Sequence, residues 1–276
     1  TWVARAAKLR PYLPLVGIAI LAYVLLVWAP GTMTPFRLGN LGKYCALALA
    51  SMGIGLAWGR GGMLVLGQGV FFGLGGYCMA MFLKLEASDP QSTSIQSTPG
   101  IPDFMDWNQL TALPFFWVPF QSLAFTLAAV VAVPGLLALG IGLAMFKRRV
   151  GGVYFAIITQ AIASVLTILI IGQQGYTGGV NGITDLKTLA GWDIRSDSAK
   201  LILYYVNAGL LLGTVLVSTW MLRTKLGGLL VAMREKEERV RFTGYDVAGL
   251  KVFVFVFAAV VSALGGAMFT LVVGFM

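Results

Sequence analysis

Histidine is absent from this sequence of 276 residues, and cysteine occurs twice. Without histidine the chain lacks the commonest general base and metal ligand of proteins. Cys45 and Cys78 each lie inside an apolar run without neighbouring ligand residues, so we expect two buried thiols and neither a disulfide nor a metal site. The sequence also contains no P-loop and no visible pair of nucleophile and base. We therefore expect no catalytic residues, no metal and no cofactor bound by this chain.

Charged residues are scarce as well, at 11% of the chain, whereas 58% of the residues are hydrophobic. A soluble domain has about 25% charged and about 45–50% apolar residues. The composition therefore predicts an all-α, polytopic membrane helix bundle that forms a single transmembrane domain over residues 1–276. A net charge of +9 suggests nucleic acid in a soluble protein, but here the cations flank apolar runs. We therefore expect the chain to be surrounded by the lipid bilayer and not to bind nucleic acid.

Seven apolar runs are candidates for membrane-spanning helices, each of which needs about 20 mostly apolar residues. They cover residues 13–29, 44–58, 63–83, 114–146, 153–171, 201–222 and 252–276. The fourth run is too long for one straight span, and Pro119 and Pro134 divide it into a short interfacial piece and a kinked span. The glycines that interrupt the second run likewise predict a broken helix.

Lys and Arg are concentrated in alternate connections between these runs, which predicts the orientation of the chain. The N-terminal residues Arg5, Lys8 and Arg10, the segment 147–149 and the loop 223–251 fall on one side. The N-terminus is therefore expected in the cytoplasm, with 223–251 as a cytoplasmic loop and Arg60 and Lys43 flanking the second span. Two external loops, 84–113 and 172–200, are long enough to be functional or flexible. The last run reaches Met276, so we also expect further sequence beyond it.

The third run is rich in glycine and carries one amide, Gln68. Glycines in a membrane helix most often permit close contact between helices. A buried amide in lipid is costly unless it meets a partner or water, so Gln68 is also a candidate for lining a polar path, together with the nearby aromatic Phe72.

Polar side chains also follow one another at helical spacing in the fifth run. Ser and Thr at such positions commonly bond to their own helix backbone, while a glutamine on the same stripe favours a cavity. Amides and hydroxyls suit a neutral, hydrogen-bonding solute better than an ion. The candidate pathway residues in this run are Tyr154, Thr159, Gln160 and Ser164. Gln160 and Ser164 share one face of the helix with Thr167.

The cytoplasmic loop contains a short segment, 226–243, that mixes positive and negative charges with an apolar stripe. The stripe predicts a helix that ends at Gly244. Such a helix lies flat on a membrane or docks in a protein groove. Interleaved glutamates are poorly suited to anionic lipid, so we favour docking to a cytoplasmic partner.

Three stretches of the sequence resemble the permeases of branched-chain-type ABC importers. They are GGLLVAMREKEERVRFTGYDVAGLKVFVFVFAAVVSALGGAMF, SMGIGLAWGRGGMLVLGQGVFFGLGGYCMAM, and GVYFAIITQAIASVLTILI followed by GYTGGVNGITDLKTLAG. The last is most similar to urea-transporter permease subunits. The resemblance extends from about residue 41 to residue 276, apart from the loop 84–113.

This resemblance implies a non-catalytic subunit of a bacterial inner-membrane importer. A second homologous permease would complete the pathway, two cytosolic ATP-binding subunits would hydrolyse ATP, and an extracytoplasmic solute-binding protein would deliver the solute. By the same resemblance, the helix that couples to the ATPase would include Arg234, Glu235, Glu237, Arg239 and Gly244. Urea is the expected substrate. The alternatives are a branched-chain amino acid importer and, in a different class, an autonomous channel for small neutral solutes.

Overall fold

The computed structural model of the chain describes residues 13–88 and 100–276, and almost all of their regular structure is helical. The N-terminal basic residues and part of the first external loop lie outside this range. Seven helices among the described residues are long and apolar enough to cross a membrane, as predicted. The spans are α2 (Leu13–Tyr23) continued by η1 (Val24–Trp28) and α3 (Ala29–Thr32), α4 (Pro35–Ile54) continued by η2 (Gly55–Arg60), α5 (Gly69–Ala87), α7 (Leu123–Phe146), α8 (Gly152–Gly172), α10 (Asp197–Arg223) and α12 (Val247–Val273).

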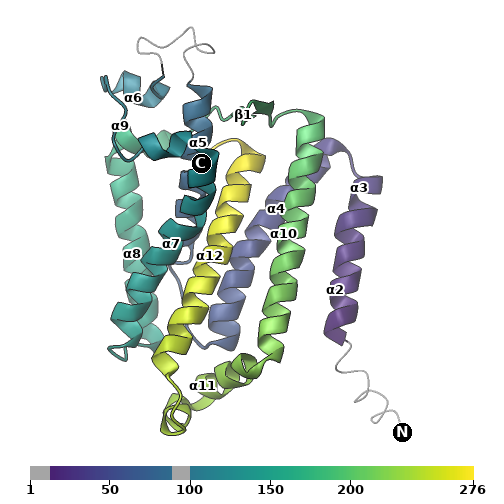
Figure 1. Cartoon of the computed structure of the whole chain (residues 1–276), viewed down its shortest axis with the longest axis vertical. Coiled ribbons are helices and arrows are strands. Elements are labelled where there is room, and N and C mark those ends of the chain that lie inside the picture. The colour runs from purple at the N-terminus through teal and green to yellow at the C-terminus, as the bar shows by residue number, and fades with distance from the viewer. Residues whose placement is uncertain (1–12, 89–99) are drawn as a thin grey trace.

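Helix α12 lies in the centre of the bundle and packs against α4, α5 and α7 (Figure 1). Small residues permit this close contact. A Cβ atom on Gly75 of α5 would collide with the backbone of Ala263, and one on Gly266 of α12 would collide with the carbonyl of Phe72. For Gly75 of the third run and Gly266 of the last run, close packing between helices is therefore the observed role.

Helix α10 packs against α4, and α2 lies outermost beside α10 (Figure 1). Two buried polar groups tie these helices together. The Asn207 amide donates to the carbonyl of Gly42 at 2.8 Å, and the hydroxyl of Tyr204 donates to the carbonyl of Leu25 at 2.6 Å. Both cysteines are buried and unpaired, as expected.

Two predicted boundaries are wrong. The third span does not begin at Met63, because residues 63–68 are non-helical and α5 begins only at Gly69. The second span starts nine residues earlier than predicted, at Pro35, so Lys43 lies inside α4 and does not flank it. Arg60 likewise belongs to the last turn of η2.

The described parts of the two loops that we predicted to be external pack, together with the segment 114–122 that precedes α7, into a cap at one end of the bundle. They contain α6 (Asp103–Trp107), η3 (Val118–Gln121), α9 (Gln174–Thr177), η4 (Gly179–Asn181) and a hairpin of β1 (Thr188–Leu189) with β2 (Trp192–Asp193). Phe104, Trp117, Ile183 and Leu186 are buried in one cluster with residues of α5. The short helix η3 is the interfacial piece predicted before α7, and Pro134 lies inside α7.

Helix α11 (Lys225–Phe242) lies at the opposite end of the bundle, between α10 and α12 (Figure 1). The connection between α7 and α8, which carries Lys147, Arg148 and Arg149, is at the same end. The alternation of the helices in space therefore agrees with the predicted division of loops between two sides of a membrane.

Candidate functional site

Gln68 lies at the break between the non-helical segment 63–68 and α5. Only 3% of the residue is exposed, and its Nε2 donates to the carbonyl of Ala258 at 2.9 Å and to Ser262 Oγ at 2.8 Å. Within the described chain, its Oε1 has no hydrogen-bond partner. Both partners lie in the middle of α12, so Gln68 fastens an irregular segment to the central helix at depth in the bundle. Irregular backbone is tolerated there because it is enclosed by protein.

Thr159 and Phe72 lie near this break and are also turned into the bundle. Thr159 is buried, and its hydroxyl donates to the carbonyl of Ala156 at 2.9 Å, the backbone bonding that is usual for threonine in a helix. The backbone of Thr159 meets Gly67 so closely that a Cβ there would clash. The space between them does not admit a water molecule. Phe72 makes an edge contact with Phe269 of α12, with ring centroids 5.5 Å apart.

Tyr154, Gln160 and Ser164 lie on the opposite side of α8, on the outer surface of this chain. Tyr154 is 75% exposed, and Gln160 and Ser164 are also exposed. The Ser164 hydroxyl donates to the carbonyl of Gln160 at 3.2 Å. The structure thus separates the predicted pathway residues into two groups, one buried between α5, α8 and α12 and one on the free face of α8.

The charged helix α11 is broken at Lys236, whose φ and ψ of −150° and 91° are not helical. The predicted apolar stripe is present, but it packs against the chain's own bundle. Leu230, Met233 and Val240 are buried in a cluster with residues of α5 and α12. The inference that this stripe seeks a partner's groove is therefore wrong, because α11 uses its apolar face to hold itself against the spans.

Two of the predicted coupling residues bind α11 to the spanning helices. Arg234 Nη1 donates to the carbonyl of Gly59 in η2 at 2.7 Å. Glu237 accepts from Arg241 at 2.9 Å within α11 and from Lys251 of α12 at 2.5 Å. The Lys251 side chain is only 13% exposed, and its ammonium also lies 5.9 Å from the ring centroid of Phe146.

The other predicted coupling residues face away from the bundle. Glu235 and Arg239 are exposed. Gly244 has a φ of +88°, a value that favours glycine and that terminates the helix as predicted. Sequence reasoning assigned no role to Phe242, yet this side chain is 89% exposed at the tip of α11, and Tyr245 beside it is 48% exposed. Both aromatic residues lie outside the apolar stripe of α11, and this position distinguishes them in the sequence from the residues that pack against the bundle.

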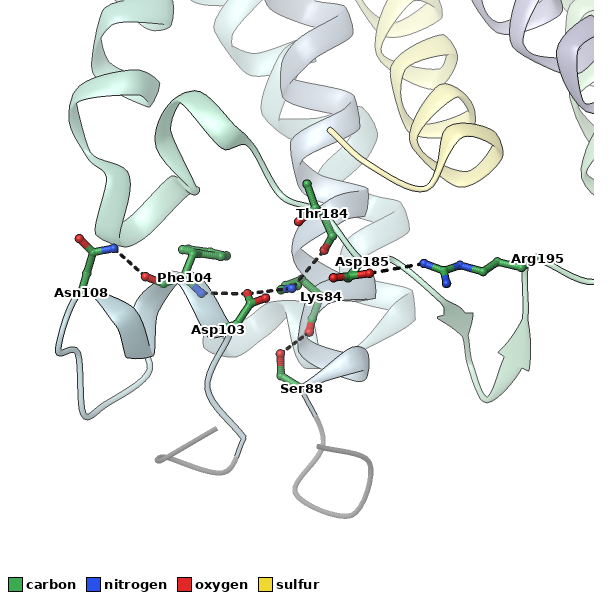
Figure 2. A network of polar contacts seen from close by, with 8 residues as sticks. All are labelled: Lys84, Ser88, Asp103, Phe104, Asn108, Thr184, Asp185 and Arg195. Carbon is green, nitrogen blue, oxygen red and sulfur yellow. Dashed lines mark hydrogen bonds and ion pairs between the residues drawn. The ribbon is translucent and has the colours of Figure 1, made fainter. Parts of the chain in front are cut away.

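The external cap is fastened to α5 by a buried ion pair (Figure 2). Lys84 Nζ lies 2.8 Å from Asp103 of α6 and donates to the carbonyl of Thr184 at 3.1 Å, while its side chain is 4% exposed. Nearby, Glu86 accepts from the backbone amides of Ala190 and Gly191 in the hairpin turn. Both external loops are thereby connected to the outer end of the same spanning helix.

A bundle with seven candidate spans, a cap at one end and a charged helix at the other defines a multi-pass membrane protein. The family described as "Branched-chain amino acid transport system / permease component" matches residues 37–276, and the chain belongs to this family.

Two curated relatives are similar to this chain. They are the proteins named "High-affinity branched-chain amino acid transport system permease protein LivM" of Salmonella typhimurium and of Escherichia coli. Each is 26% identical, over 249 and 251 residues respectively, and each alignment covers 82% of this chain. The chain spans about half the length of these relatives (50% of each). No solved structure matches the chain.

Proposed function

We propose that this chain is the membrane-spanning permease of an ABC importer of the branched-chain amino acid type, and that it has no catalytic activity of its own. A second homologous permease would complete the pathway, cytosolic subunits would bind and hydrolyse ATP, and an external protein would deliver the solute. The family membership supports this class. The observation that carries the proposal is the charged helix α11, which is fixed to two spanning helices and presents exposed aromatic residues at its tip.

The contacts of α11 suggest how force from an ATPase would reach the spans. Arg234 holds α11 to the end of η2, and Glu237 holds it to the first turns of α12. Gln68, in the non-helical segment that follows η2, is bonded to the middle of α12. A displacement of α11 would therefore act on both sides of the break that contains Gln68. We propose this set of contacts as the coupling route.

The free face of α8 is our candidate for the wall of the pathway. Gln160, Ser164 and Tyr154 lie on it, and an amide and a hydroxyl in a span are costly against lipid. Burying them against a second permease, with the solute between, would remove that cost. Gln68, Phe72 and Thr159 would then support the wall from behind and would not contact the solute in this conformation.

The substrate we propose is a branched-chain amino acid. The two similar relatives are named for high-affinity branched-chain amino acid transport, and no finding supports the urea expectation. The spans were expected to suit a neutral solute because they carry amides and hydroxyls, but they also carry cationic side chains. Lys84 is buried within α5, and Lys43 lies inside α4. The bundle therefore does accommodate cationic side chains.

A transport assay with matched variants of α11 tests this proposal. The full-length protein is copurified with its cognate subunits, reconstituted into proteoliposomes, and supplied with ATP, the external protein, and labelled leucine or labelled urea. We expect two ATPase chains to copurify and ATP to drive leucine uptake. Glu237→Gln should lower this uptake because it releases Lys251, whereas Glu238→Gln, which removes the same charge from an exposed neighbour on α11, should not.

The outcomes separate the rival functions. Uptake of urea in preference to leucine would restore the urea assignment while leaving the importer class intact. Uptake that needs no ATP, without copurifying ATPases, would support an autonomous channel. Equal uptake by the Glu237→Gln and Glu238→Gln variants would refute the coupling route but not the substrate.

A further inference from the structure

A cavity of about 260 Å³ lies between the outer halves of α4, α10 and α12, beneath the end of the β1–β2 hairpin. None of the candidate pathway or coupling residues lines it. Its lining combines two lysines and an asparagine with apolar residues. The lining residues are Phe36, Gly39, Asn40, Gly42, Lys43, Ile194, Lys200, Leu203, Tyr204, Val272 and Val273.

The cations of this cavity are incompletely paired. Lys43 is partly buried, and in the part of the chain that the structure describes its ammonium has no ion-pair or hydrogen-bond partner. Lys200 Nζ lies 3.0 Å from Asp197, but the Asp197 side chain is 74% exposed and does not line the cavity. The lining contains no carboxylate at all, so the cavity attracts anions.

The position of Lys43 is costly for a lysine without a ligand. It follows the start of α4 at Pro35 by eight residues, which places it about 12 Å along the helix at 1.5 Å per residue. Ionisable residues inside spans are expensive and generally mark a site with a partner. The apolar residues Phe36, Leu203 and Val272 of the same lining would contact a hydrocarbon portion of the ligand.

We propose that this cavity binds the phosphate headgroup of an anionic phospholipid from the adjoining leaflet. A cavity of this size has room for a phosphodiester group, and the acyl chains would lie outside it, beside the exposed Phe36. A zwitterionic solute such as an amino acid is less suitable, because its ammonium would meet two lysines and no counter-ion. This inference does not depend on the proposed transport function.

Lipid retention measured by native mass spectrometry tests the proposal. The full-length protein is exchanged into nanodiscs of mixed phosphatidylglycerol and phosphatidylcholine, released into mild detergent, and examined for bound lipid. Wild-type protein should retain phosphatidylglycerol preferentially. Lys43→Gln should reduce this retention about fivefold, the size expected for one lysine beside an anionic lipid. Lys187→Gln makes the same charge change at an exposed site outside the cavity and should retain lipid as the wild type does.

A further variant and a competition experiment complete this test. Lys43→Arg preserves the charge and should preserve retention, which distinguishes loss of the site from misfolding. If Lys43→Gln does not fold, a wild-type protein that retains both lipids equally overturns the proposal by itself. Equal retention by Lys43→Gln and Lys187→Gln would also overturn it. Displacement of the lipid by millimolar inorganic phosphate or by free leucine would show that the cavity takes a soluble ligand, and the lipid assignment would fall.

Discussion

Replacing Asp103 with asparagine is predicted to loosen the external cap from α5. Lys84 has a side chain that is 4% exposed, and with asparagine at position 103 its ammonium would keep only neutral oxygens as partners, among them the carbonyl of Thr184. Removing one member of a buried ion pair costs about 3–5 kcal/mol in free energy of unfolding. We expect about 3 kcal/mol, at the low end, because the Asp103 side chain is 25% exposed and water reaches that side of the pair.

The reverse change, Lys84→Met, should cost less. It replaces a long side chain with an apolar one of similar shape inside a largely apolar cluster, and the remaining carboxylate can turn to water. We expect about 1–2 kcal/mol, with the double variant close to Lys84→Met alone, so that the coupling energy has a magnitude of about 3 kcal/mol. Unfolding by SDS titration measures these free energies. Hydrogen exchange at the amide of Phe104, which donates to Asp103 at 2.8 Å, reports on the cap itself.

The pair of Lys200 with Asp197 provides the control for this experiment. It has the same chemistry at a similar distance, 3.0 Å, but its side chains are 38% and 74% exposed. Exposed pairs contribute about 0–1 kcal/mol, so Asp197→Asn should change stability by at most that amount. If Asp103→Asn and Asp197→Asn prove equally mild, the pair at Lys84 does not hold the cap, and apolar packing alone must do so.

Three further predictions concern other parts of the chain. Gly266→Ala should destabilise the protein by about 1–3 kcal/mol in thermal unfolding, because the new methyl group meets the backbone of α5. Gly140→Ala places a methyl group in open space on α7 and should not destabilise the protein. Equal effects of the two variants would contradict the close packing. Gln68→Leu should cost about 1–3 kcal/mol by the same measurement, since it removes two buried hydrogen bonds to α12. An unchanged melting temperature would contradict this structural role. Phe242→Ala should leave stability within about 0.5 kcal/mol but weaken ATPase copurification about tenfold or more, and unchanged copurification would exclude this side chain as an anchor.

The sequence was sufficient to predict the seven spans because hydropathy over about 20 residues depends little on neighbouring helices. It was not sufficient to locate where α5 begins. Residues 63–68 are mostly apolar, as the residues of a spanning helix are. The spacing of apolar residues does not by itself distinguish a short extended segment from a helical one. The break depends on Gln68 bonding to α12 and on Gly67 meeting Thr159, contacts between residues far apart in the sequence.

The cap was missed for the same physical reason. Its loops are polar and rich in turn-forming residues, which in the sequence favours a mobile connection. In the structure, residues as distant as Lys84, Asp103 and Thr184 meet, and scattered apolar residues between the turns are buried together. A single sequence contains no information on which polar residues of two separate loops become neighbours.

For the candidate sites, the sequence identified informative residue types but did not show which way their side chains face. The stripe on α11 correctly predicted that one face of the helix is covered. An apolar stripe does not say whether the covering surface belongs to the same chain or to a partner, because burial stabilises the helix equally in both cases. Once Leu230, Met233 and Val240 are assigned to the chain's own core, the residues left for a partner are those outside the stripe. These include Phe242, and an aromatic side chain that remains 89% exposed at the tip of a helix anchored by two charged contacts is suited to bind a pocket on another subunit.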